Sequence, residues 1–416
     1  MKKDLIAAAV AAAVAVPAVA QVTISGTLDL SALQDAKVSV GGTPAAALAG
    51  ATNGQFTSTT SAVGNVGAWT TSNLSFSATE DLGGGLKASA FINQGVNNNT
   101  GALDARDRFV ALGGGFGEVK LGRFTPALDG YGGYAAPGTP NSFGTSDSDG
   151  FDLLAGTIAT TQTVASMRPG ETRLSDRSGS FARQAGVVQY SSPVLSGFKV
   201  TAELIQNESN INPTDSTGKT KGNQNGFRLD YTAGPLAISY ANGKRKVENE
   251  QVAAVTATAL DAGATGGVAA VNNRSGSASV QWLGAAYSLG GARFFYAYGD
   301  RDDKETTNTA ANGEVKTKET TIHNLGVSVA LGAMTLTASA YEGDVKMPNT
   351  AAAVALDGAN DRDVAGYQVG ARYALSKRTF GYAVMGQNKS EDKTPAAAAA
   401  DITKVRGYAV GLVHTF

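Results

Sequence analysis

The last ten residues, 407–416, read GYAVGLVHTF and show the pattern that decides the fold. Counting back from Phe416 in steps of two gives His414, Leu412, Val410 and Tyr408. The positions between them hold smaller side chains, namely Thr, Val, Gly, Ala and Gly. A period of two is typical of a β-strand, whose successive side chains point to opposite faces of the sheet. The segment therefore predicts a strand with one large, mainly apolar face and one face of smaller residues.

The same period recurs along the chain, for example in residues 73–78, 366–373 and 379–384. Tight turns, mostly glycine-rich, join such strands in pairs, and glycine suits them because these turns need a positive φ. The seven turns are residues 80–85, 113–117, 192–197, 232–235, 288–292, 330–333 and 374–378. We attribute the 52 glycines of the chain to these turns and to small positions facing the interior of the fold.

Longer polar loops alternate with the turns. The eight loops are residues 34–67, 96–104, 125–182, 207–223, 248–274, 303–317, 347–360 and 391–401. Together the connections predict sixteen strands. Short turns at one end and long loops at the other are the plan of an outer-membrane β-barrel, whereas a soluble β-sandwich or β-solenoid does not explain this asymmetry.

We therefore predict an all-β fold, a 16-stranded antiparallel transmembrane β-barrel formed by residues 21–416 as a single domain. The sheet must close because every backbone N–H and C=O needs a partner in lipid. The face with Leu, Phe, Tyr and Val is expected to touch lipid, and the smaller, polar face is expected to line a water-filled interior. The short turns would be periplasmic and the long loops extracellular.

Residues 1–20 predict a cleaved signal peptide. Lys2 and Lys3 precede an apolar run from Leu5 to Val16, and Ala18–Ala20 supply small residues before Gln21. This order of charge, apolar run and small residues is typical of a secretory signal. A membrane anchor is the alternative, but the run is shorter than the ~20 residues that a helical span needs. The chain is thus expected to cross the periplasm and reach the outer membrane.

Composition excludes several classes of function. The chain has no Cys, which excludes a disulfide framework, a zinc–thiolate site and a cysteine nucleophile. Lys and Arg number 34 against 35 Asp and Glu, which argues against a nucleic-acid partner. The histidines are His323 and His414, too few for a histidine-rich metal site or a catalytic triad. We expect no enzyme activity, no cofactor and no metal.

Four segments resemble the Gram-negative general porins, in particular the trimeric 16-stranded porins of β-proteobacteria. They are residues 79–87 (TEDLGGGLK), 109–123 (FVALGGGFGEVKLGR), 188–198 (VQYSSPVLSGF) and 407–416. The resemblance implies a homotrimer in outer-membrane lipid and lipopolysaccharide, with the third long loop folded into the pore. It implies passive diffusion of small hydrophilic solutes and ions. Phe416 with Tyr408 is similar to the signal that the barrel-assembly machinery reads.

The third loop, residues 125–182, is the candidate constriction, because a loop of about 58 residues is far longer than ordinary loops and such loops are usually functional. Its acids are Asp129, Asp147, Asp149 and Asp152. The run SDSDG at 146–150 lacks the spacing and the final Glu of an EF-hand, so solvated loop acids are favoured over a weak Ca²⁺ site.

A basic wall is expected opposite these acids. If Phe109 faces lipid, alternation turns Arg106 and Arg108 toward the interior. The same argument turns Lys120 and Arg183 inward, and the resemblance matches Arg106 and Arg183 with the arginine cluster of the family's constriction. Asn73 stands where relatives commonly have arginine, which favours weak ion selectivity.

Two further functions stay open on the sequence. Aromatic residues in the third loop would suit a substrate-specific channel for sugars or organic acids. The long first loop, 34–67, would suit an adhesive or structural surface barrel.

Overall fold

A computed structural model describes residues 21–41, 57–63, 69–97, 101–127, 184–210, 219–252, 271–306, 315–346, 361–393 and 402–416. The predicted signal peptide, residues 1–20, lies outside these ranges. The strands are β1 (Gln21–Gly41), β2 (Thr57–Val63), β3 (Asn73–Gly83), β4 (Leu86–Val96), β5 (Leu103–Gly114), β6 (Gly117–Phe124), β7 (Gln184–Ser191), β8 (Phe198–Asn210), β9 (Lys219–Ala233), β10 (Leu236–Val252), β11 (Val271–Leu289), β12 (Ala292–Thr306), β13 (Val315–Leu331), β14 (Met334–Lys346), β15 (Arg362–Ala374), β16 (Thr379–Asp392) and β17 (Ile402–Thr415). No helix in the described part of the chain is long and apolar enough to cross a membrane.

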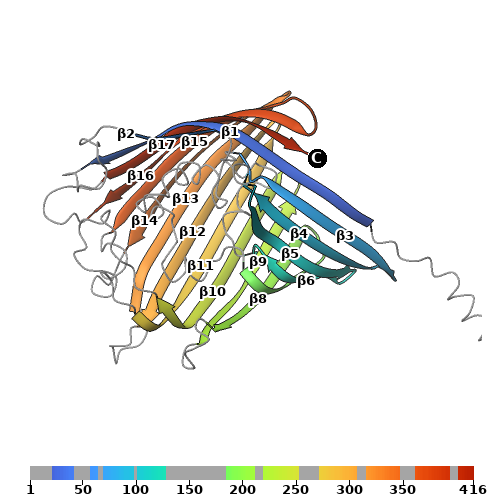
Figure 1. Cartoon of the computed structure of the whole chain (residues 1–416). Helices are drawn as coiled ribbons and strands as arrows, with labels where there is room; N and C mark the ends of the chain where they lie inside the picture. Colours follow the sequence, from blue (N-terminus) through green and yellow to red (C-terminus); the bar gives the residue numbers. More distant parts are fainter. Residues whose placement is uncertain are drawn as a thin grey trace, which may run out of the picture.

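The strands form one closed antiparallel sheet (Figure 1). Each strand from β3 to β17 pairs with the next, and β17 pairs with β1 to close the barrel. Strands β2 and β3 share one position in the wall, because β3 pairs with residues 21–27 of β1 and β2 pairs with residues 32–38. The seventeen strands therefore occupy sixteen positions, and the predicted 16-stranded barrel is confirmed.

All seven predicted turns connect the strands expected of them. Several contain glycine with a positive φ, as at Gly234 (54°) and Gly332 (62°). At both positions the backbone adopts a left-handed conformation that strongly favours glycine. The turns and both ends of the barrel chain lie at the same end, since the Thr415 N–H bonds to the carbonyl of Arg378 in the last turn.

The two faces of the wall differ in chemistry. Leu30 (49% exposed) and Leu204 (58%) lie on the outer face, whereas their neighbours Asp29 (0%) and Glu203 (3%) lie on the inner face. Many large apolar side chains share the outer face, which is the arrangement that a surrounding of lipid stabilises. The prediction that the polar face lines the interior is confirmed for these strands.

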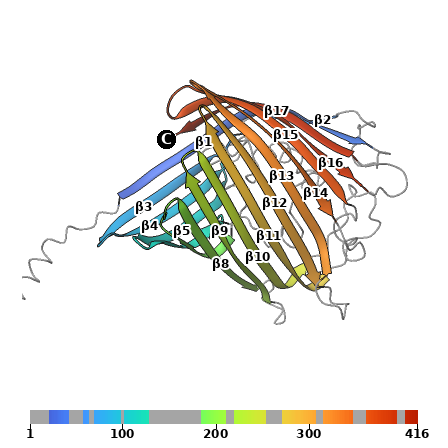
Figure 2. The ribbon, with the colours of Figure 1, turned by 180° about the vertical axis from the view of Figure 1, so that it is seen from behind.

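The wall is much lower on one side than on the other (Figures 1 and 2). Strands β6 and β7 have 8 residues each, whereas β11 has 19. Parts of the predicted loops 34–67, 248–274 and 303–317 are strand instead. The apolar alternation that marks a strand fades beyond the lipid, while the backbone hydrogen-bond ladder continues.

The rule that large apolar residues face lipid is wrong at three notable positions. Phe109 lies on the inner face, where its ring is 5.8 Å from that of the buried Phe124. Tyr382 and Val384 are also inner residues, 6% and 4% exposed, whereas the intervening Ala383 is exposed on the outside. The ring of Tyr382 is covered by that of Trp69, and the ring of Phe109 packs against that of Phe124, so size alone does not identify the lipid face.

Glycine on the inner face makes room for aromatic rings. A Cβ atom at Gly299 would overlap the ring of Trp282, and one at Gly326 would overlap the ring of Phe295. Each ring therefore lies flat over the neighbouring strand instead of projecting inward. The predicted role of glycine at small interior positions is confirmed there.

The C-terminal residue helps to close the barrel by bonding to the first strand. Phe416 and Gly26 exchange two backbone hydrogen bonds of 3.0 and 3.1 Å, and the Phe416 ring covers Gly26 on the outer face. Tyr408 lies on the same outer face, where it is 46% exposed.

Candidate pore and its constriction

The inner wall carries charge of both signs. The register places the following ionic residues on it: Lys120, Lys199, Arg228, Arg245, Arg293, Arg301 and Arg372, with Asp29, Asp107, Glu118, Glu203 and Asp230. The outer face opposite them is predominantly apolar over the middle of the strands. Such a wall suits a water-filled interior in which ions and polar solutes pass charged groups.

The third loop begins by turning into the barrel. At the end of β6, Phe124 points inward and is 2% exposed, and Pro126 is buried after it. The next N–H, of Ala127, donates a 2.6 Å hydrogen bond to Oε2 of Glu203 on β8. Since β7 lies between β6 and β8, the chain crosses the inner face of β7 to make this bond. The root of the loop is therefore inside the barrel.

Lys120 stands at this root. Its Nζ lies 4.1 Å from the ring centroid of Phe124 and 4.9 Å from that of Phe109, which are cation–π distances. It pairs with Ala111 and Gln189, both inner residues. The structure thus places Lys120 on the inner wall, as alternation predicts.

Arg106 reaches the inner side through a β-bulge. Two residues of β5, Arg106 and Asp107, oppose the single residue Asn93 of β4. A Cβ atom at Gly95 would lie 3.3 Å from Cδ of Arg106, and Gly95 pairs with Asn73 on the inner face. A bulge interrupts strict alternation and bends the strand locally. The sequence predicts that Arg106 points inward, but the reason is this bulge and not strict alternation.

A family model described as Gram-negative porin matches residues 7–393, which is most of the chain. The chain belongs to the Gram-negative porin family. Family membership together with the barrel places this porin in the outer membrane.

Individual relatives are more distant. Over 130 residues the porin is 35% identical to the major outer membrane protein P.IB of Neisseria meningitidis, a match that covers 31% of this chain. The chain spans about a third of the length of that curated relative, since the match covers 35% of it.

Two solved structures share the fold over nearly the whole chain. The anion-selective porin from Comamonas acidovorans has a TM-score of 0.58 at 21% identity, covering 96% of this chain and 100% of that chain. OmpT of Vibrio cholerae in its trimer form has a TM-score of 0.59 at 13% identity, covering 95% and 99%. At these identities the likeness establishes the barrel fold alone.

Arg108 does not line the interior of this porin. It pairs with Ile92, which is 46% exposed, and shares its face with the exposed Val110 and Leu112. Its expected inward orientation was derived from a lipid-facing Phe109, and that starting point is wrong. Arg123, which pairs with Arg108, lies on the outer face as well.

The remaining predicted constriction residues lie outside the described part of the chain. These are Arg183 on the basic wall and the loop acids Asp129, Asp147, Asp149 and Asp152.

The sequence reasoning missed the inner arginines of β9, β10, β12 and β15, and two of them lie on the tall side of the porin with little exposure. Arg245 on β10 is 8% exposed and Arg301 on β12 is 6% exposed. Each makes further polar or electrostatic contacts. Alternation could have found both, because Tyr240 on β10 and Tyr296 on β12 face outward at odd spacings from them.

Asn73 sits in a neutral network. Its Oδ1 accepts from Nδ2 of Asn93 at 3.2 Å, and Asn93 also donates to Ser75 at 2.7 Å. Position 73 itself therefore contributes a neutral amide to the inner wall.

Neither histidine is near the interior. Nδ1 of His323 is 2.7 Å from the hydroxyl of Tyr296, and Nδ1 of His414 is 2.9 Å from that of Thr379, all on the outer face.

Proposed function

We propose that the protein is a general diffusion channel, which passes small hydrophilic solutes and ions through the outer membrane without a cofactor or turnover. The observation that carries the proposal is the inside-out wall, apolar outside and ionic inside, combined with the inward root of the third loop at Ala127. A barrel of sixteen strands is too wide to be filled by its own side chains.

Bilayer recording tests this proposal directly. Purified protein added to a planar lipid bilayer should give stepwise conductance with a near-linear current–voltage relation. Added sugars or organic acids should not block at low concentration, whereas saturable block would favour a substrate-specific channel. Purified, folded protein without any conductance would refute a channel.

We further infer that the channel works as a homotrimer. The low side of the wall, around β6 and β7, exposes large apolar residues such as Val110, Leu121 and Val188 on its outer face. The short strands β6 and β7 extend less far out of the membrane than the long strands of the opposite side. In a trimer, a neighbouring copy would cover the apolar outer face of these short strands. Conductance steps in groups of three, together with a trimer mass in detergent, are the expected results, and single independent steps would argue against it.

The selection mechanism we propose is a transverse field. Arg106, Lys120 and Arg183 would form the basic wall, facing the acids of the third loop across a passage too narrow for full salt screening, which extends over ~8–10 Å. Arginine keeps its charge even when crowded by other cations. Arg106→Ala combined with Arg183→Ala should shift the reversal potential in a salt gradient toward cations, and an unchanged potential would remove both residues from the constriction.

Export and assembly complete the proposal. Residues 1–20 would be removed as a signal peptide, and the outward Tyr408 and Phe416 would be read by the barrel-assembly machinery before the barrel contacts lipopolysaccharide. N-terminal sequencing of the mature protein should begin at Gln21. A mature chain that still starts at Met1 would contradict the export step.

A further inference from the structure

The wall is interrupted between β2 and β3. The pairing of β1 passes from Thr27, opposite β3, to Ala32, opposite β2. Between these positions the side chain of Ser72 takes the place of a strand. Its Oγ accepts a 3.0 Å hydrogen bond from the Asp29 N–H and lies 3.3 Å from the Asp29 carbonyl oxygen. The carbonyl of Ser72 still accepts the N–H of Val96 on β4 at 2.8 Å, so the described residues that have left the wall are 69–71.

Asp29 provides the acceptors for this departing chain. Its side chain is on the inner face and is fully buried, at 0% exposure. Oδ2 accepts the N–H of Trp69 at 2.8 Å and the N–H of Thr70 at 2.7 Å, and Oδ1 accepts the hydroxyl of Tyr382 at 2.7 Å. Three donors around one carboxylate stabilise its charge without solvent. They also satisfy two backbone N–H groups that the wall no longer pairs.

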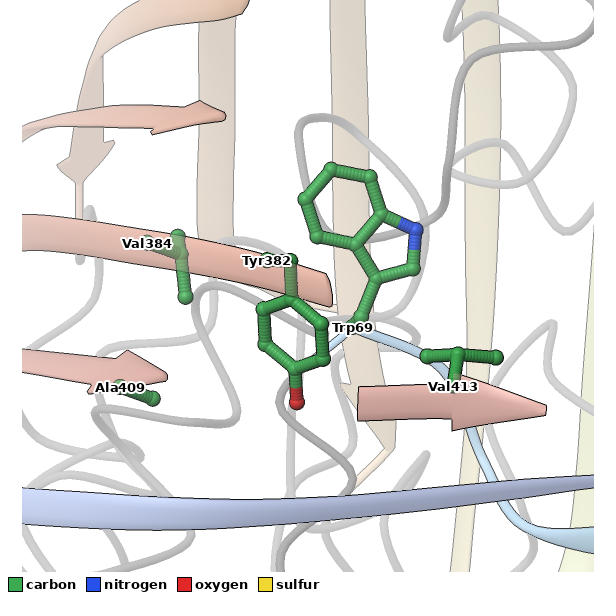
Figure 3. Close-up of a cluster of buried hydrophobic side chains, with 5 residues drawn as sticks. All are labelled: Trp69, Tyr382, Val384, Ala409 and Val413. Atoms are coloured by element: carbon green, nitrogen blue, oxygen red, sulfur yellow. The ribbon is translucent and has the colours of Figure 1, made fainter. Parts of the chain in front are cut away.

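The side chain of Trp69 shows which side the segment occupies. It is 3% exposed and packs on the inner residues of β16 and β17, among them Tyr382 (Figure 3). The centroid of the Trp69 ring lies 5.3 Å from that of Tyr382 and 5.6 Å from that of Phe380. Val384, Ala409 and Val413 complete the cluster. Tyr382 can lie flat because its ring covers Gly411, where a Cβ atom would collide with it. The segment thus lies on the inner surface of the barrel.

We propose that Asp29 is a positioning residue that holds residues 69–71 against the inner wall, and that this segment narrows the channel from the side of β16 and β17. Chain packed on the face of a sheet occupies up to ~10 Å above it, which is a large part of the bore of such a barrel. The narrowing rests on the proposed channel function, whereas the positioning does not.

Tryptophan fluorescence can report the position of the segment without any conductance measurement. The chain has two tryptophans, so Trp282→Phe leaves Trp69 as the single reporter. In this background, folded barrels should shield Trp69 from acrylamide quenching. Asp29→Asn keeps the shape of the side chain but replaces one of its two acceptor oxygens with an NH₂ group, which cannot accept a hydrogen bond. We expect an about tenfold or larger increase in the detached population, seen as stronger quenching and a red-shifted emission.

A matched control removes the same charge without touching the segment. Asp230 is another inner carboxylate, bonded to Arg228 and Ser239 in the wall. Asp230→Asn should leave Trp69 quenching unchanged, although it shifts ion selectivity. Asp29→Asn should raise both quenching and conductance. Equal quenching and equal conductance in the two variants, both folded by heat-modifiable mobility, would overturn the proposal.

A milder variant covers the case in which Asp29→Asn does not fold. Tyr382→Phe removes only the donor to Oδ1 and keeps both backbone bonds, so a smaller increase in the same direction is expected. No increase in either readout would overturn the positioning role. Should quenching rise while even the parent protein fails to conduct, the positioning role stands and the channel function fails instead.

Discussion

Removing the side chain of Glu203 should release the root of the third loop. In the structure Oε2 of Glu203 accepts the N–H of Ala127 at 2.6 Å and an N–H of the Gln189 side chain at 3.3 Å. Glu203 is 3% exposed, so water cannot readily replace the carboxylate. The Glu203→Ala variant therefore leaves the loop root without the acceptor that now holds it inside the barrel.

The magnitude follows from the charged hydrogen bond. A hydrogen bond to an ionised group contributes about 1.5–3 kcal/mol, and this range applies to the bond between Glu203 and Ala127. At ~1.4 kcal/mol per factor of ten, the equilibrium for detachment of the loop root should rise roughly 10- to 150-fold. The barrel itself should still fold, because the ladder of β8 with its neighbours does not depend on this side chain.

Single-channel recording measures the consequence. Glu203→Ala should add current noise or new conductance levels that are rare in the parent channel. The matched control is Glu203→Gln, which removes the same charge but keeps an oxygen in place for Ala127. Both variants should shift the reversal potential toward anions by similar amounts, because both remove one inner negative charge. The reasoning is refuted if Glu203→Ala is as quiet as Glu203→Gln while their reversal potentials agree.

Three further changes test the inner wall and the seam. Gly299→Ala should destabilise the barrel by about 1–3 kcal/mol, measured as a lower heat-modification temperature, because the new methyl group displaces the Trp282 ring; an unchanged temperature would mean that the ring has free space. Arg245→Ala with Arg301→Ala should shift the reversal potential toward cations, and an unchanged potential would contradict their inward placement. Phe416→Ala should lower the yield of folded barrel in refolding from urea, since the ring covers the seam, and an equal yield would restrict Phe416 to a recognition role.

The sequence predicts most of the barrel because two simple signals coincide. The alternation at 407–416 and the turns at Gly234 and Gly332 depend on local geometry, and both are found as predicted. Loop lengths also carry information, since the asymmetry between turns and loops distinguishes a membrane barrel from a soluble sandwich.

The face of individual residues is harder to predict. Phe109 and Tyr382 are large and apolar, yet both point inward. Phe109 packs against the buried side chains of neighbouring strands, and Tyr382 packs against Trp69. The error at Phe109 carried over to Arg108, which was placed inside and lies outside. The bulge at Arg106 depends on pairing with β4, and no local signal in the sequence reveals it.

Both inward segments follow from one physical requirement. Chain that leaves a membrane-embedded wall brings backbone N–H groups that no strand pairs, and lipid offers them no partner. Glu203 accepts the N–H of Ala127, and Asp29 accepts those of Trp69 and Thr70. A buried carboxylate is costly by itself, but it is stable where several donors surround it. An acidic residue on the small-residue face of a strand, with aromatic residues on neighbouring inner positions, therefore marks where chain has folded into a barrel. It is a feature that can be sought in other sequences of this architecture.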